Sequence, residues 1–160
     1  MTGRRVLALV GIVALLAPSA EALAKARGCF TKKEQQAEEV VRQGLRMREG
    51  GEGCDGAPWY AETKPLWDMV NQQFGAQFAE QTDIRNKAFM REFENDAEHK
   101  LSLWNARIVF YFRNYPLSAG YCTTVKKMLT DAPQKGWKDI IKQAHYARDE
   151  IRMTYEPCDK

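Results

Sequence analysis

Residues 83–115, DIRNKAFMREFENDAEHKLSLWNARIVFYFRNY, carry the longest helical pattern in the chain. The first half is amphipathic, because apolar side chains recur every three or four residues. These side chains are Ala88, Phe89, Phe93, Ala97 and Leu101. The second half, LSLWNARIVFYF, is apolar on almost every side, so it needs neighbours all round. We therefore expect residues 83–115 to form the central helix of a small helical bundle.

Length and composition favour one globular domain. The chain has 160 residues, of which 44% are hydrophobic and 28% charged, which is enough for one core and short for two. The formal net charge is +3, and basic residues alternate with acidic ones along the chain. A nucleic-acid-binding protein shows a concentrated basic surface instead. We expect neither DNA nor RNA as a partner.

The first 24 residues have the pattern of a signal peptide. Arg4 and Arg5 precede an apolar run at 6–17, and Ala22-Leu23-Ala24 forms a small-x-small cleavage site. The apolar run is too short for a membrane span, which needs about 20 residues. We therefore expect residues 25–160 to be the mature helical domain, periplasmic or secreted, with no stable membrane anchor.

All four cysteines, Cys29, Cys54, Cys122 and Cys158, fall in the expected mature chain. An even number of cysteines in an oxidising compartment predicts two structural disulfides. No two cysteines have the C-x-x-C spacing. The motifs of thioredoxin-like redox proteins, covalent c-type haem and zinc knuckles are therefore missing.

The sequence leaves the disulfide pairing open. If the last two helices form an antiparallel hairpin, Cys122 and Cys158 lie at the same end and can bond. Cys29 and Cys54 would then pair across a helix of about 18 residues, roughly 27 Å, although bonded cysteines have Cα atoms within about 7 Å. Alternatively, Cys54 bonds at the end where Cys122 and Cys158 lie, and Cys29 takes the remaining cysteine.

Capping residues and glycines set the bounds of the first expected helix. Thr31 and Glu34 have the spacing of a capping box, followed by an apolar stripe at helical spacing. Four glycines at 50–56 are expected to form a loop, because glycine destabilises a helix. We therefore expect this helix to end near Arg48.

Further helices are expected at 63–80, 119–130 and 136–155. Pro116 ends the helix at 83–115, because proline removes a hydrogen-bond donor and restricts the residue before it. No proline separates 63–80 from 83–115, so one continuous helix over 63–115 remains an alternative. No alternating strand pattern appears. The predicted fold is an all-α, single-domain bundle of four or five helices, stapled by two disulfides.

Two histidines offer a candidate metal site. Asp96 precedes His99 by three residues and Asp149 follows His145 by four, so each pair can share a helix face. Two such faces could converge on a metal ion. The Glu-x-x-His repeats of ferritin-like bundles are absent, however. We prefer to interpret the four residues as solvated, and we keep a metal-binding or metal-dependent helical bundle as the alternative function.

The residues for other enzyme chemistry are also lacking. Ser102 and Ser118 are the only serines after the signal peptide, and neither lies in a G-x-S-x-G motif. Neighbouring acids such as Glu38 and Glu39 are interpreted as solvated helix faces. We expect no catalytic residue and no cofactor.

Aromatic side chains suggest a binding function. Trp67, Trp104 and Trp137 have helical spacing and are expected in the core. Trp59 and Tyr60 lie in a connector beside glycines and a cysteine, where exposure favours contact with a partner. We expect an exported, non-enzymatic binding or protein-interaction module whose partner is a protein or a small apolar ligand.

Overall fold

The computed structural model describes residues 27–147, 151 and 155–158. The expected signal peptide, residues 1–24, and the candidate ligand Asp149 lie outside the described residues. The helices are α1 (Lys32–Asp55), α2 (Lys64–Phe93), the 3-10 helix η1 (Glu94–Asp96), α3 (Ala97–Arg113), α4 (Ala119–Lys135) and α5 (Trp137–Ala147). The described part of the chain contains no strand beyond an isolated bridge of Phe30 with Pro157. The prediction of an all-α bundle is confirmed.

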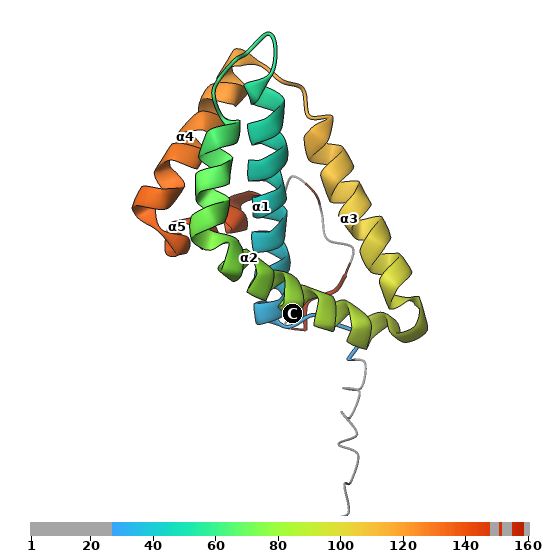
Figure 1. The fold of residues 1–160 in the computed structure, drawn as a ribbon. Helices are drawn as coiled ribbons and strands as arrows, with labels where there is room; N and C mark the ends of the chain where they lie inside the picture. The colour runs from blue at the N-terminus through green and yellow to red at the C-terminus, as the bar shows by residue number, and fades with distance from the viewer. Residues whose placement is uncertain (1–26, 148–150, 152–154, 159–160) are drawn as a thin grey trace, which may run out of the picture.

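Helix α1, and not the segment 83–115, is the centre of the bundle. It packs against α2, α3, α4 and α5, and Figure 1 shows it between α4 on one side and α3 on the other. Most of its apolar stripe is buried, with Ala37 and Val40 both at 0% exposure. The predicted capping box begins it: Thr31 Oγ1 accepts from the Glu34 backbone N–H, and the Glu34 carboxylate accepts from the Thr31 N–H.

The expected central helix is broken into two differently directed helices. Helix α2 runs from Lys64 through Phe93, and η1 turns the chain before α3 starts. Glu94 begins the turn with a φ of 42°, a conformation that L-residues rarely adopt. The turn lets Trp104 and Ile108 of α3 pack back into a core shared with Phe89 of α2. A straight helix would have carried those side chains away from α1.

Helix α1 also continues through the glycines that were expected to stop it, ending at Asp55. Its neighbours approach too closely for larger side chains. A Cβ atom at Gly50 would lie 3.1 Å from Val125 Cγ2, and one at Gly51 would lie 3.3 Å from Trp67 Cβ. Packing against α2 and α4 therefore outweighs the helix propensity that glycine lacks, about 1 kcal/mol per residue.

The last two helices also differ from their predicted bounds. Helix α4 extends past Thr130 and contains Pro133 in its final turn, ending before Gly136 at a φ of 79°. Helix α5 ends at Ala147, and Ile151 and Tyr155 are not helical. Both of these residues instead pack with α2 and α3 in the core around Phe89. The chain therefore turns back toward the start of α1.

Two disulfides fasten the two ends of α1. Cys29 bonds Cys158 with a Cα separation of 4.9 Å, and Cys54 bonds Cys122 with one of 5.4 Å. This pairing is among the alternatives that the sequence left open, and the bond of Cys122 with Cys158 does not form. The reason is the return of the chain after α5, which brings Cys158 beside Cys29. Disulfides of this kind indicate an oxidising compartment.

Among the helices of the described residues, none has the length and apolar character needed to span a membrane.

Candidate interaction site at the connector between α1 and α2

The connector between α1 and α2, residues 56–63, is held rigidly at both ends. The Ala61 N–H donates to the Cys54 carbonyl at 3.0 Å, and Thr63 Oγ1 donates to the Gly51 carbonyl at 2.7 Å. Cys54 is itself bonded to Cys122 of α4. These contacts connect the loop to α1 and α4, so its conformation is fixed by the bundle and is available to a partner without reordering.

The two aromatic side chains of the connector have different environments. Trp59 is half-buried and packs against the core formed by α1, α2, α4 and α5. Tyr60 is 71% exposed. Tyr60 and Glu62 have φ values of 42° and 54°, and a backbone held in this region is often found at binding sites. The loop thus presents one ring to solvent and uses the other as its anchor.

A groove of about 450 Å³ lies between the connector and the outer side of α4. Trp59 and Ala61 line it from the connector, and α4 contributes Ala119, Cys122, Thr123, Lys126, Lys127, Thr130 and Asp131. Its lining combines one aromatic ring with hydroxyl and charged groups. Such a groove fits a partner with both apolar and polar groups better than a purely apolar small molecule, which needs to be almost fully enclosed.

Ion pairs order the charged side of this groove. Lys126 Nζ lies 3.7 Å from a Glu62 carboxylate oxygen, which links α4 to the connector. Asp131 accepts from Lys127 at 2.7 Å and from Lys135 at 2.8 Å. These hydrogen bonds lower the pKa of Asp131 below its usual value. The groove therefore carries a carboxylate flanked by ammonium groups.

Three of the four candidate metal ligands, Asp96, His99 and His145, lie within the described residues, and their side chains are exposed. His99 Nδ1 is 3.3 Å from Asp96 Oδ1 at the start of α3, as the spacing predicted, and both are exposed. His145 Nδ1 on α5 lies 3.5 Å from Glu39 Oε2 on α1. Within the described residues, no three or more His, Cys, Asp and Glu side chains are grouped to hold a metal ion.

A buried polar cluster was not expected from the sequence. Glu38, interpreted as a solvated acid, has 0% exposure and pairs with Arg42 one turn further along α1. Its Oε1 atom also accepts from Trp104 Nε1 of α3 at 3.0 Å. Arg85 of α2 is also buried, at 3% exposure, and burial lowers its pKa. The signal was present, because Glu38 and Arg42 lie beside the apolar residue Val41 on the same helix.

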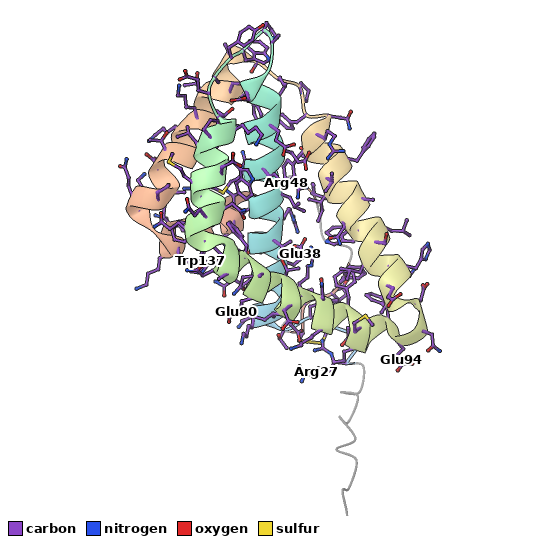
Figure 2. The ribbon with its side chains drawn as sticks, viewed as in Figure 1. Arg27, Glu38, Arg48, Glu80, Glu94 and Trp137 are labelled. Carbon is purple, nitrogen blue, oxygen red and sulfur yellow. A yellow bond between two sulfur atoms is a disulfide. The ribbon has the colours of Figure 1, made fainter. Side chains whose placement is uncertain are left out.

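The three tryptophans expected in the core differ in burial. Trp104 is 3% exposed and fully packed, whereas Trp67 and Trp137 are half-buried. Both half-buried rings pack against Phe78 of α2, with centroids 6.1 and 5.0 Å away. Figure 2 shows Trp137 beside α2. All three contribute to packing. Of the two connector residues expected to be exposed, Tyr60 is exposed, whereas Trp59 is half-buried.

Comparison of this chain with protein families, with curated proteins and with solved structures finds no match.

Proposed function

We propose that this protein is an exported, non-enzymatic interaction module that binds a partner protein through the connector and the adjacent groove on α4. The observation that carries the proposal is Tyr60, which is 71% exposed on a loop that is hydrogen-bonded to α1 beside the disulfide of Cys54 with Cys122. Tyrosine and tryptophan are enriched among the residues that dominate binding energy. A rigid loop also loses little conformational entropy when a partner binds.

Charge and shape support a protein segment as the partner. Lys126 and Lys127 line the groove with one acid, Asp131, so the lining keeps a net positive charge that favours an acidic side chain of the partner, which would compete with Glu62 for Lys126. Trp59 lines the groove with an apolar ring, against which an apolar side chain of the partner can pack. The partner segment that fits these groups is extended, with an apolar residue next to an acidic one.

Export supports a partner outside the cytoplasm. The two disulfides indicate an oxidising compartment. Among oxidising compartments, the signal-peptide pattern in residues 1–24 favours the periplasm or the cell exterior. We propose that the partner is met there, after the disulfides have formed.

Site-specific photo-crosslinking tests the proposal. Tyr60 is replaced by the photoreactive residue p-benzoylphenylalanine, and the protein is irradiated in the cells that naturally make it. We expect one discrete protein adduct, because the ring at this position would lie in the interface. The adduct should disappear when Lys126→Glu is added, since this substitution reverses the charge of the groove.

Met69 provides the matched control. It is an apolar residue of α2 with 50% exposure, outside the connector and the groove. The same photoreactive residue at this position should give no discrete adduct. Equal adducts from both positions, or none from position 60, would show that the connector is not a specific contact site.

A further inference from the structure

The outer face of α3 exposes large apolar side chains. Leu103 is 55% exposed and Phe110 is 71% exposed, and the exposed Ala106 lies between them. Residues 103, 106 and 110 lie three and four positions apart, so they form one stripe along the helix. Figure 1 shows α3 at the edge of the bundle, where its inner face packs toward α1 and α2. The outer stripe therefore has no covering helix among the described residues.

The charges of α3 are divided between its two ends. Glu94 and Asp96 in η1 and Glu98 in the first turn are acidic, and Figure 2 shows Glu94 at the turn from α2. Arg107 and Arg113 lie in the second half of α3, and the chain has no Asp or Glu between positions 99 and 130. Lys100 pairs with Asp96 at 3.6 Å, but the acids outnumber it, so the helix has net negative charge where it begins and is basic where it ends.

We propose that the outer face of α3 binds the same face of a second copy of this chain, with the two helices antiparallel. A two-fold axis at Ala106 places Leu103 against Phe110 of the partner subunit, and the symmetry repeats this contact. The small side chain of Ala106 lets the helices approach each other at the axis. The apolar stripe is thus complementary to itself.

The same axis places opposite charges together. Glu98 of each copy comes near Arg113 of the partner subunit, whose own side chain is 64% exposed while it contacts Glu49. A parallel pair would instead bring each acidic end beside the other acidic end. Arg107 stays beside the stripe, because its guanidinium lies over its own Trp104 ring, 5.5 Å from the centroid. Charge therefore selects the antiparallel arrangement.

The size of the stripe predicts a weak dimer. A helix of 17 residues is about 25 Å long and about 10 Å wide. Contact along one such helix buries less than the roughly 800 Å² per partner that is usual in stable complexes. We therefore expect reversible association with a dissociation constant between about 1 μM and 1 mM.

Sedimentation velocity over a concentration series tests the pairing with the oxidised mature protein. We expect the weight-average mass to rise from monomer to dimer. Phe110→Ser should weaken dimerisation about tenfold or more, because it removes the largest apolar contact. Met69→Ser is the matched control, since it removes a comparably exposed apolar residue from α2 and should leave dimerisation unchanged. A monomer at every concentration up to roughly 1 mM overturns the proposal.

A charge reversal tests the orientation. Glu98→Lys should weaken the dimer, because it places an ammonium group near Arg113 of the partner subunit, and the loss should diminish as salt rises. A parallel pair would be unaffected or strengthened by the same substitution, which would overturn the antiparallel arrangement. Circular dichroism of each variant confirms that the helices are intact, so a change in mass reports on association. If Phe110→Ser and Glu98→Lys both dimerise as strongly as the unsubstituted protein, the copies associate through another surface, and this result would likewise overturn the proposal.

Discussion

Arg91 connects the second half of α2 to the beginning of α1. Its guanidinium pairs with Glu34 and donates to the Cys29 carbonyl at 3.3 Å. Glu92, the next residue, accepts from the Arg27 and Gly28 backbone N–H groups at 3.1 and 2.7 Å. Two adjacent residues of α2 therefore hold the chain that enters α1.

The ion pair with Arg91 makes the contribution of Glu34 to stability depend on pH. Its hydrogen bond with Arg91 is the largest cause of a pKa lowered from 4.5 to about 2, and the capping-box bonds of Thr31 add to it, while burial opposes them. The unfolded chain takes up this proton near pH 4.5 and the folded chain only near pH 2. Glu34 therefore stabilises the fold above pH 4.5, and this contribution disappears as the pH falls toward 2.

We predict that Glu34→Gln reduces the dependence of stability on acid. The free energy of unfolding of the variant should fall less between pH 4.5 and 2, and at pH 7 it should be lower by about 1 kcal/mol, a value limited by solvent screening. Urea titrations at several pH values measure both quantities. Glu80, an exposed carboxyl of α2 labelled in Figure 2, is the control, and Glu80→Gln should keep the parental acid profile.

At the scale of the element, a single glycine controls how closely α1 and α2 approach. A Cβ atom at Gly44 would lie 2.9 Å from Phe78 Cε1. The Phe78 ring has no simple way to move, because it packs between Trp67 and Trp137. Gly75 of α2 is also helical, but a Cβ atom there meets nothing closer than Asn71 Oδ1 at 3.5 Å.

The same substitution should therefore have opposite effects at the two positions. Gly44→Ala should destabilise the protein by about 1 to 3 kcal/mol, because it forces the Phe78 ring out of its packing. Gly75→Ala should stabilise it by up to about 1 kcal/mol, because alanine favours a helix and space is available. Chemical denaturation of both variants measures the difference. Stabilisation by both would mean that α1 and α2 are not in close contact at Gly44.

Local signals were readable from the sequence, and signals that depend on distant neighbours were not. The capping box of Thr31 and Glu34 involves residues three positions apart, and it was predicted there and is present. The continuation of α1 through Gly50 depends on Val125 of α4, and the break at Glu94 depends on a shared core. Neither the contact of α1 with α4 nor the core shared by α2 and α3 can be inferred from the spacing of residues in the sequence.

Part of the candidate site was also predictable from local sequence, and part of it was not. Exposure of Tyr60 was predicted from its neighbours in a glycine-containing connector, and it is exposed. The groove beside it was not predictable, because it requires Lys126 of α4 to lie opposite the connector. That arrangement follows from the bond of Cys54 with Cys122, and the sequence left this pairing open. Knowledge of the disulfide pairing would have located the groove.

At the scale of the whole molecule, the disulfides fix the two ends of α1 in different ways. The bond of Cys54 with Cys122 joins α1 to α4 within a core, where both cysteines are buried. The bond of Cys29 with Cys158 joins the two ends of the described chain, where the Phe30 N–H donates to the Glu156 carbonyl at 2.9 Å. The first bond lies between packed helices, whereas the second holds terminal segments.

We predict that removing either disulfide lowers the free energy of unfolding by about 2 to 5 kcal/mol, but with different local effects. In a Cys29→Ser, Cys158→Ser variant, the Phe30 amide should exchange with solvent much faster than in the parent, because its bond to the Glu156 carbonyl is no longer held in place. In a Cys54→Ala, Cys122→Ala variant, exchange at Phe30 should increase only through global unfolding. Hydrogen exchange measured by NMR separates the two outcomes. If the exchange rate of the Phe30 amide increases equally in both variants, the terminal segments open only when the whole bundle unfolds.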